Sequence, residues 1–379
     1  MFHKNILIFG LKNYKMKIIQ IIPNLGYGGA EKFCIELANE LGKTNEVSLI
    51  SLYEYDELTM LPKNLINENI NLIFLNKKKG FDLKIIISLL LIILKKRPDI
   101  INTHLNALMY IAIPYLFFYR RVKIFHTVHN LADKEVGKFL QKVYNIFFNY
   151  LKIYPIAISH EVLKSIKKIY GNKHNYLINN GINKPAVSLN LERVNEEIAS
   201  YKLNDKTKVF LNVGRINKQK NQESLLRVFA EHKQHLLLII GNADINNIDL
   251  KEKLLINKPD NVIFLDNKNN VGDYMSLVDF FILSSSYEGL PITLLEAMSL
   301  GSFVLSTPVG GIPDVIENKV NGLLSKGISD KEINDIILTS LDYSENEILT
   351  VKNNAEKTFL NKFTMKICSE EYFQLYSLV

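Results

Sequence analysis

Cysteine is scarce in this chain of 379 residues, which contains only Cys34 and Cys368, far apart in the sequence. Two such residues cannot build a disulfide framework or a paired-cysteine metal site. This cysteine usage fits a reducing compartment, so the sequence predicts a cytoplasmic protein.

Long apolar runs are also missing. The longest, IIISLLLIIL at residues 85–94, would rise roughly 15 Å as a helix, about half the thickness of a bilayer core. We expect a buried helix there, with a helix that dips into a membrane as the alternative. Lys12, Lys15 and Lys17 interrupt the N-terminal apolar run, so it lacks the layout of a signal peptide. Residues 1–15 are compatible with an extra strand, a loose extension or an upstream start codon.

Several familiar binding signatures are absent. The glycine-rich stretch NLGYGGAEKF is not a G-x-G-x-x-G fingerprint and has no Walker lysine, which excludes the usual dinucleotide and P-loop interpretations. No metal-ligand cluster and no Asp-x-Asp at a strand end are present, so we expect neither a metal nor another cofactor. Nucleic acid is not an expected partner, because no known binding motif occurs.

Charge is distributed unevenly. Residues 1–190 contain 26 Lys and Arg against 13 Asp and Glu, whereas residues 191–379 contain 20 against 26. Seven cations crowd the long apolar run: Lys77, Lys78, Lys79, Lys84, Lys95, Lys96 and Arg97. A solvated helix face is one interpretation; contact with anionic lipid headgroups or a lipid-linked diphosphate is the other.

Short β-branched runs alternate with helical patterns along the whole chain, as in KIIQIIP, EVSLISLY, DIINTH and KIFHTVHN. This rhythm predicts an α/β protein with parallel sheets covered by helices. It loosens at residues 186–207 and then restarts. We therefore expect a Rossmann-like domain at 1–185, a linker at 186–207 and a second Rossmann-like domain at 208–362. The sequence also predicts closing helices near 330–341 and 363–378.

Two such domains would face each other across a cleft at the carboxyl ends of their strands, where ligands of open α/β sheets bind. Gly28 and Gly29 precede a helix and would let backbone approach an anion. Gly310 and Gly311 would do the same later in the chain. Arg215 follows a strand in VGRINKQK, and Lys220 follows a few residues later.

Two acids lie eight positions apart in YEGLPITLLEAMSLG. Glu288 comes just before an expected helix start, and Glu296 lies one to two turns inside that helix. An ionised carboxylate only accepts hydrogen bonds and therefore suits sugar hydroxyls. The alternative is an acid that complements the helix dipole and an ordinary surface glutamate.

Three histidines lie near strand ends: His104, His126 and His129. His126 and His129 are three residues apart and should point to opposite faces of a strand. Only one of them should therefore face the cleft, and His129 is nearer the loop. We expect His104 and Asn130 on the acceptor side of the site. A structural role is the alternative for each histidine.

Five ordered motifs resemble the retaining glycosyltransferases of family 4, which have the GT-B fold. They are GGAE at 28–31, VGRINKQK at 213–220, YEGLPITLLEAMSLG at 287–301, VGGIPDVI at 309–316 and NGLL at 321–324. The two glutamates match the E-x7-E signature of that family. Asn221 and Asp266 stand where the family commonly has glycine.

The resemblance implies a role for each matching position. Arg215 and Lys220 would bind the nucleotide diphosphate, and Gly28 and Gly29 would line the cleft near it. Glu288 would contact donor-sugar hydroxyls beside the backbone N–H groups of Gly289 and Leu290. Glu296 would hold the ribose. His129 would lie near the new bond, so the catalytic set is Glu288, His129, Lys220 and Arg215. The helix at 363–379 would return to the first domain.

The expected activity is transfer of a hexosyl or N-acetylhexosaminyl group from a nucleoside diphosphate sugar, with UDP before GDP-mannose in order of expectation. The acceptor would be a lipid-linked saccharide in capsule, lipopolysaccharide or exopolysaccharide synthesis, reached by peripheral contact with the anionic inner membrane face. A catalytically silent nucleotide-sugar-binding subunit and a GDP-mannose-dependent mannosyltransferase are the alternatives.

Overall fold

The structure is a computed structural model that describes residues 15–379 except 58, 118–120, 172, 174, 190 and 245. The expectations for residues 1–15 therefore lie, apart from Lys15, outside the described residues. The chain divides into two compact units. The first unit contains the chain up to Ala157 together with Ser165–Ile178 and Ser369–Val379, and the second contains Ile158–Lys164 and Asn179–Cys368.

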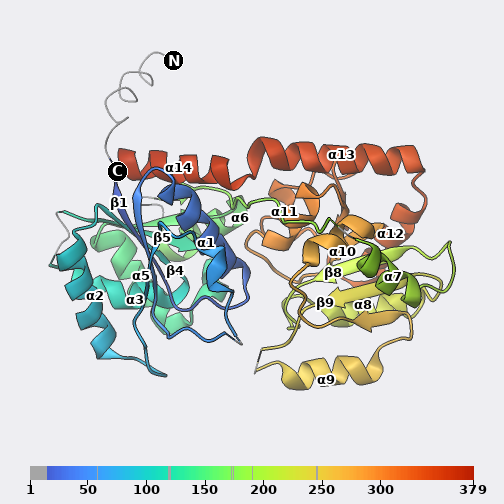
Figure 1. The fold of residues 1–379 in the computed structure, drawn as a ribbon, viewed down its shortest axis with the longest axis horizontal. Helices are drawn as coiled ribbons and strands as arrows, with labels where there is room; N and C mark the ends of the chain where they lie inside the picture. The colour runs from blue at the N-terminus through green and yellow to red at the C-terminus, as the bar shows by residue number, and fades with distance from the viewer. Residues whose placement is uncertain are drawn as a thin grey trace, which may run out of the picture. The chain divides into compact units, whose positions relative to one another are not determined.

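A seven-stranded parallel sheet forms the centre of the first unit (Figure 1), with the order β3-β2-β1-β4-β5-β6-β7. Its strands are apolar and rich in β-branched residues, because both faces of the sheet are covered by other elements. They are β1 (Lys17–Ile22), β2 (Glu46–Ser51), β3 (Asn71–Phe74), β4 (Ile100–His104), β5 (Lys123–Val128), β6 (Ile153–Ala157) and β7 (Tyr176–Leu177).

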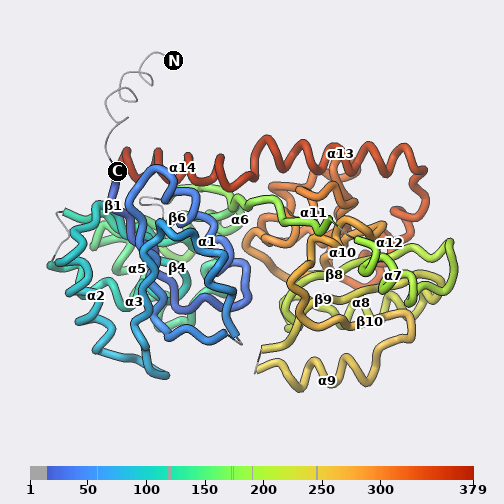
Figure 2. Tube along the Cα trace, viewed as in Figure 1, coloured from blue at the N-terminus to red at the C-terminus, as the bar shows by residue number. Residues whose placement is uncertain are grey.

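Helices that are distant in sequence meet on this sheet. Residues 369–378 of α14 (Met365–Leu378) lie beside α1 (Gly29–Gly42), as Figure 2 shows, and Phe33 and Tyr372 join them with ring centroids 6.1 Å apart. The remaining helices are α2 (Leu83–Lys96), α3 (Leu108–Tyr115), α4 (Ala132–Glu135), α5 (Lys138–Tyr150), α6 (His160–Tyr170) and the short η1 (Lys63–Leu65) and η2 (Leu105–Ala107).

The second unit repeats the architecture with six parallel strands in the order β10-β9-β8-β11-β12-β13. Its strands are β8 (Val209–Val213), β9 (Leu236–Ile240), β10 (Val262–Phe264), β11 (Phe280–Leu283), β12 (Phe303–Ser306) and β13 (Leu323–Leu324). Its helices are α7 (Glu192–Tyr201), α8 (Gln222–Phe229), α9 (Ile248–Asn257), α10 (Val271–Leu277), α11 (Ile292–Ser299), η3 (Ile312–Asp314), α12 (Asp330–Leu341) and α13 (Glu345–Lys362).

Two of these helices were not anticipated from the sequence. Helix α7 lies within residues 186–207, which the sequence predicts as a linker. It buries Val194 and Ile198, which are one turn apart. Helix α13 fills the interval between the two helices expected at the C-terminus. It begins at a capping box in which Ser344 and Glu347 satisfy each other's backbone N–H groups. Gly310 and Gly311, which the sequence placed before a helix, are followed only by the 3₁₀ turn η3.

Both sheets reverse their strand order at one place, between β1 and β4 in the first unit and between β8 and β11 in the second. Parallel sheets bind ligands just beyond the carboxyl ends of the strands at such a point, where the connecting loops diverge. We therefore expect the functional residues to lie in the loops that follow these four strands.

Candidate functional site

A partly buried ion pair occupies the reversal point of the second sheet. Lys220, from the loop after β8, donates through Nζ to Oε1 of Glu288, from the loop after β11, at 2.7 Å. The Lys220 side chain is 16% exposed and that of Glu288 is 6% exposed. The sequence predicted both residues separately, and the structure brings them into direct contact.

Glu288 receives two further hydrogen bonds. Ser285 Oγ donates to Oε1 at 2.6 Å, and Gln219 Nε2 donates to Oε2 at 3.2 Å. The carboxylate is therefore held by a cation, a hydroxyl and an amide. Its orientation is fixed while part of its acceptor capacity stays unused. Gln219 and Ser285 could not be identified from the sequence, because only their place in these loops distinguishes them.

The loop between β8 and α8 is shaped by its backbone. Asn221 adopts a left-handed conformation, with φ of 52°, and Ser284 Oγ donates to the carbonyl of Lys220 at 2.9 Å. Asp266 is also left-handed, with φ of 48°. Asn and Asp tolerate this region better than other side chains do. The two departures from the glycine pattern therefore preserve the backbone shape that glycine would give.

Gly310 and Gly311 are required by close backbone packing. A Cβ on Gly310 would come within 1.9 Å of the carbonyl oxygen of Glu288, and Gly310 has φ of 59°. Gly311 N donates to the carbonyl of Gly289 at 2.6 Å. From the sequence, these glycines were expected to let a ligand approach the backbone. In the structure, these glycines also allow their turn to pack closely against the loop that carries Glu288.

The second unit also contains other residues that were expected to bind the donor. Glu296 is in the middle of α11 and is buried, as are Gly289 and Leu290 before that helix. Arg215 lies in the same loop as Lys220 with its side chain exposed, and it forms no ion pair with any carboxylate of the described residues. The structure therefore joins Lys220 to Glu288 but does not join Arg215 to either.

A row of buried polar side chains occupies the reversal point of the first sheet. His104 Nε2 lies 2.8 Å from Oε1 of Gln20, and His104 Nδ1 lies 2.8 Å from Nε2 of His129. Asn102 Nδ2 donates to the same Gln20 oxygen at 3.0 Å and to Thr127 Oγ1 at 3.1 Å. Thr127 Oγ1 is in turn 3.0 Å from the hydroxyl of Tyr372 on α14.

The hydrogen bonds of this row determine which ring nitrogens of His104 and His129 carry protons. An amide oxygen only accepts, so His104 must donate to Gln20 from Nε2. A neutral His104 then accepts at Nδ1, which requires His129 to donate from Nε2. The lone pair of a neutral His129 is therefore at Nδ1. That nitrogen suits a hydroxyl donor, such as one on a sugar.

Burial holds both rings neutral. It lowers the pKa of His104 well below its usual value, with a further contribution from His129. Burial also lowers the pKa of His129 to about 3, with a smaller contribution from His126. Neither ring is expected to act as an acid near neutral pH.

These lowered pKa values predict an acid-sensitive fold. The unfolded chain takes up protons near pH 6.5 while the folded rings do not, so stability should fall as the pH drops below 6.5. At pH 5.5, the His104 ring alone should cost about 1.4 kcal/mol relative to high pH. Urea unfolding of His104→Gln and of the unsubstituted chain at pH 7.5 and 5.5 measures this difference.

His104→Gln should lose less stability between pH 7.5 and pH 5.5 than the unsubstituted chain does, because a glutamine at this position does not titrate. An equal loss of stability on acidification with and without His104 would contradict the neutral buried pair.

The remaining predicted residues of the first unit are Gly28, Gly29 and Asn130. Gly28 precedes α1 with an ordinary extended backbone, and a Cβ there would meet only the side chain of Glu31. Gly29 is the first residue of α1. Asn130 is half-buried and accepts from the backbone N–H of Leu131 through its own side chain at 2.8 Å. The fold itself therefore does not require glycine at position 28.

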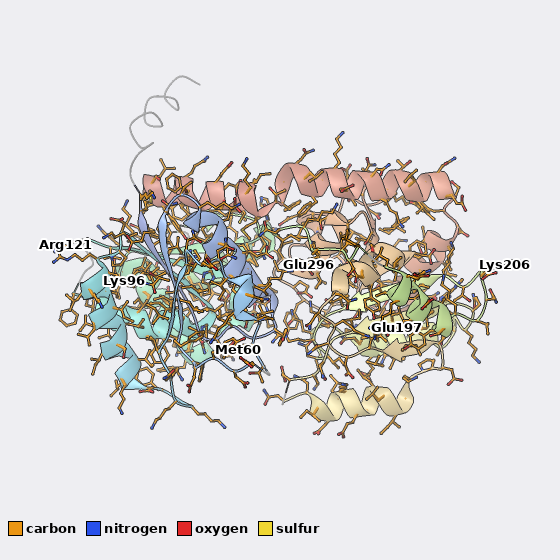
Figure 3. The ribbon with its side chains drawn as sticks, in the orientation of Figure 1. Met60, Lys96, Arg121, Glu197, Lys206 and Glu296 are labelled. Atoms are coloured by element: carbon orange, nitrogen blue, oxygen red, sulfur yellow. The ribbon has the colours of Figure 1, made fainter. Side chains whose placement is uncertain are left out.

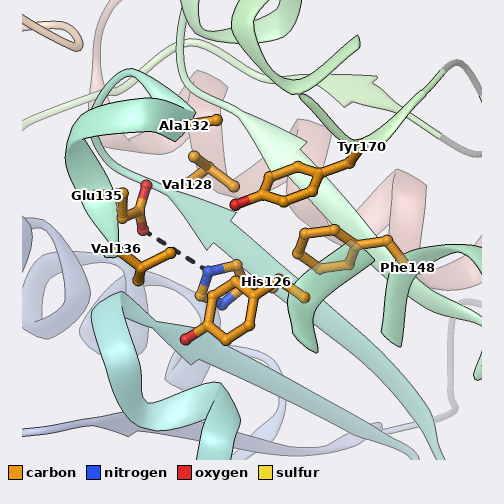
Figure 4. A pocket seen from close by; sticks show the side chains of 8 residues that line it. His126, Val128, Ala132, Glu135, Val136, Phe148 and Tyr170 are labelled. Atoms are coloured by element: carbon orange, nitrogen blue, oxygen red, sulfur yellow. Dashed lines mark ion pairs between the residues drawn. The ribbon is translucent and has the colours of Figure 1, made fainter. Parts of the chain in front are cut away.

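His126 points to the opposite face of β5 from His129, as the spacing predicted. It lies in a small pocket with Tyr144, Phe148 and Tyr170, and its Nε2 is 3.6 Å from Oε1 of Glu135 (Figure 4). Burial raises the pKa of Tyr144 and of Tyr170, with a further contribution from Glu135 in each case. His126 is thus packed against helices away from the polar row.

Comparison with known proteins gives consistent matches over both units. Residues 27–184 match the family described as Glycosyltransferase Family 4, and residues 194–358 match the family described as Glycosyl transferases group 1. Together the matches cover most of the chain and follow one another in order.

Curated relatives match over most of their length. One is the UDP-Gal:alpha-D-GlcNAc-diphosphoundecaprenol alpha-1,3-galactosyltransferase of Escherichia coli, which is 24% identical over 95% of this chain and 91% of its own. Another is the capsular polysaccharide biosynthesis glycosyltransferase CapM of Staphylococcus aureus, 26% identical over 78% of this chain and 81% of its own.

Solved structures share the fold. HepE of Anabaena, crystallised in complex with UDP and glucose, superposes with a TM-score of 0.82 at 19% identity and covers 96% of this chain and 100% of its own. WaaG, a glycosyltransferase of lipopolysaccharide biosynthesis, gives a TM-score of 0.69 at 15% identity over 96% of this chain and 100% of its own. The expected GT-B fold is confirmed, and the chain belongs to the glycosyltransferases, with a family 4 segment followed by a group 1 segment.

Proposed function

We propose that this chain is a retaining transferase that moves a hexosyl or N-acetylhexosaminyl group from a nucleoside diphosphate sugar, with UDP as the expected nucleotide, to a hydroxyl of a lipid-linked saccharide. The observation that carries the proposal is the partly buried contact between Lys220 and Glu288 at the carboxyl edge of the second sheet. A cation and an acceptor-only group at one point suit the diphosphate and the sugar of one donor.

Each predicted site residue has a part in the proposed reaction. Lys220, held by Glu288, and the exposed Arg215 would neutralise the diphosphate as it leaves. Glu288 would accept hydroxyls of the donor sugar, and Glu296 would accept those of the ribose. His129 would accept a sugar hydroxyl at Nδ1. Gly28 and Gly29 would approach the diphosphate by backbone.

The proposed step breaks the bond between the anomeric carbon and the diphosphate oxygen and forms a bond to the acceptor oxygen on the same face. The acceptor's hydroxyl proton passes to the departing phosphate oxygen. A double displacement would need a carboxylate on the opposite face. Glu288 already has three donors around it, and we assign it to orientation.

The acceptor is proposed from the curated relatives. The Escherichia coli relative is named for a diphosphoundecaprenol-linked acceptor. A second relative, from Campylobacter jejuni, is named for a GalNAc-containing PP-undecaprenol acceptor and is 25% identical over 82% of this chain and 84% of its own. We place this chain in the synthesis of surface polysaccharides on such carriers, from the cytoplasmic side of the membrane.

A donor panel tests the proposal. Thermal shifts with UDP-, GDP- and ADP-sugars should show the largest stabilisation with a UDP-hexose or UDP-N-acetylhexosamine. Free UDP should then accumulate only when a lipid-linked acceptor is present, and NMR of the product should show the anomeric configuration of the donor. A preference for GDP-mannose would identify the mannosyltransferase alternative, and binding with no turnover on any acceptor would identify a silent subunit.

The same assay tests the proposal that sugar transfer needs no metal ion. Because Lys220 and Arg215 are assigned to the diphosphate charge, turnover should be unchanged within about twofold when EDTA is added. A loss of turnover with EDTA that Mg²⁺ or Mn²⁺ restores would overturn that assignment while leaving the transfer reaction in place.

A further inference from the structure

Helix α2 has an apolar outer face. Leu83, Ile87, Leu91 and Leu94 are each 51–64% exposed, and we call these four residues the α2 stripe. At 100° per residue they fall within a sector of about 80° along one side of the helix. The opposite side, with Ile85, Ile86, Leu89 and Ile93, is buried in the first unit.

Such a face is unusual for a helix at a protein surface. A helix that packs on a core with one side normally turns polar residues outward, and large exposed apolar patches mark interaction sites. Helix α2 instead presents leucine and isoleucine on both sides. Packing within the first unit therefore accounts for only half of its sequence.

Cations surround the stripe. Lys84 and Lys95 are exposed next to it on the helix, and Lys78, Lys79 and Arg97 are exposed at its two ends. Asp82 is the one acid between residues 75 and 98, and its carboxylate accepts the backbone N–H of Lys84 at the start of the helix. The surface around the stripe is therefore both apolar and strongly positive.

Neighbouring segments extend this character. Phe81, just before α2, is 61% exposed and stacks on Tyr110 of α3 with ring centroids 5.4 Å apart. Leu116 and Phe117, at the end of α3, are also exposed, and α3 packs against α2. Arg121 follows and points away from the ribbon (Figure 3).

We infer that the α2 stripe and its cations dock this chain onto the surface of an anionic phospholipid bilayer. A helix of 14 residues is about 21 Å long and cannot span a bilayer, but an apolar face flanked by lysines can lie in the headgroup region. Among the helices of residues 15–379 that the structure describes, none is long and apolar enough to cross a membrane.

A bilayer fits this surface better than a second copy of the chain does. A symmetric contact would bring two clusters of lysines together with only one acid, Asp82, in each to offset them, which is unfavourable. Anionic headgroups supply the opposite charge, and each lysine near such a surface adds about fivefold to the affinity. The choice of a bilayer deepens the proposed function, on which it rests, because a lipid-linked acceptor is found there.

Vesicle sedimentation of the full chain tests the inference. Vesicles of phosphatidylcholine with phosphatidylglycerol should bind the chain at low salt, and phosphatidylcholine alone should bind it at least tenfold more weakly. Ile87→Gln/Leu91→Gln should weaken binding at least tenfold, and Lys84→Gln/Lys95→Gln should weaken it about twenty-five-fold at low salt. The control is Ile256→Gln/Leu349→Gln, which changes one isoleucine and one leucine that are at least about as exposed on the second unit.

Three results would overturn the inference: no binding to anionic vesicles at low salt, equal binding by the stripe variant and the control, or a concentration-dependent dimer that the stripe variant abolishes. Turnover on a water-soluble acceptor lacking the lipid should be the same in the stripe variant and the control. Vesicle binding without any transfer would refute the proposed function alone, and transfer without vesicle binding would refute this inference alone.

Discussion

Lys220→Ala is expected to lower kcat/KM for sugar transfer by about a hundredfold to a thousandfold, the usual effect of removing one preorganised donor from a developing negative charge. Lys220 is the partly buried cation at the carboxyl edge of the second sheet, and Glu288 holds its Nζ at 2.7 Å. The variant should bind both UDP and UDP-sugar more weakly, because the diphosphate is common to the two. Steady-state kinetics and thermal shifts with each ligand measure these effects.

Glu288→Gln is expected to lower kcat/KM by a similar factor through a different route. Three donors converge on the carboxylate, from Lys220, Ser285 and Gln219. A glutamine has only one side-chain oxygen. Its NH2 group, which is itself a donor, would therefore lie against at least one of these three donors. This variant should lose affinity for UDP-sugar while keeping that for UDP, since Glu288 is assigned to the sugar.

Lys218→Ala is the matched control, because Lys218 is an exposed lysine of the same loop. It should retain turnover within about twofold. Circular dichroism must show that each variant remains folded at the assay temperature. Near-normal turnover in folded Lys220→Ala or Glu288→Gln would refute the assigned roles, as would an equal loss in Lys218→Ala.

The sheets could be predicted from the sequence because their strands are short apolar, β-branched runs between polar loops, such as KIIQIIP and KVFLNVG. Helix α13 was missed although Ser344 and Glu347 form the capping signature at its start. Its following residues are mostly polar and bury only Val351, Ala355 and Phe359. A narrow apolar stripe of this kind gives little periodic signal.

The charged members of the candidate site could be named from motif spacing, but the partners that orient them could not. Ser285 and Gln219 reach Glu288 only because β8 and β11 are neighbours in the sheet. The polar row of the first unit depends likewise on β1, β4, β5 and a helix more than 240 residues away, where Tyr372 meets Thr127. Single-sequence patterns do not contain such long-range pairings.

Asn221 and Asp266 show a different limit. Both replace a glycine of the family pattern, and both have positive φ, 52° and 48°. The residue type was therefore a readable sign of a left-handed turn, because Asn and Asp are the side chains that enter this region most readily. Asn221 and Asp266 are therefore expected to keep the loop geometry that glycine would give at the same positions.

Gly310→Ala is expected to destabilise the second unit by more than about 3 kcal/mol, or to displace the loop that carries Glu288, and in either case to abolish most transfer. Alanine at φ of 59° costs about 1–2 kcal/mol by itself. In addition, its Cβ would lie 1.9 Å from the carbonyl oxygen of Glu288, a backbone atom that cannot rotate away. Urea unfolding and kcat/KM measure the two consequences.

Gly301→Ala separates the clash from the backbone strain. Gly301 has a similar φ of 67°, but a Cβ there would have no neighbour closer than 4.0 Å. This control should therefore cost only the 1–2 kcal/mol of the left-handed conformation and keep normal turnover. If the two alanine variants lose equal stability and equal activity, the contact between Gly310 and Glu288 does not position the carboxylate. A much larger loss in Gly310→Ala would mean that the packing of this turn holds Glu288 against Lys220.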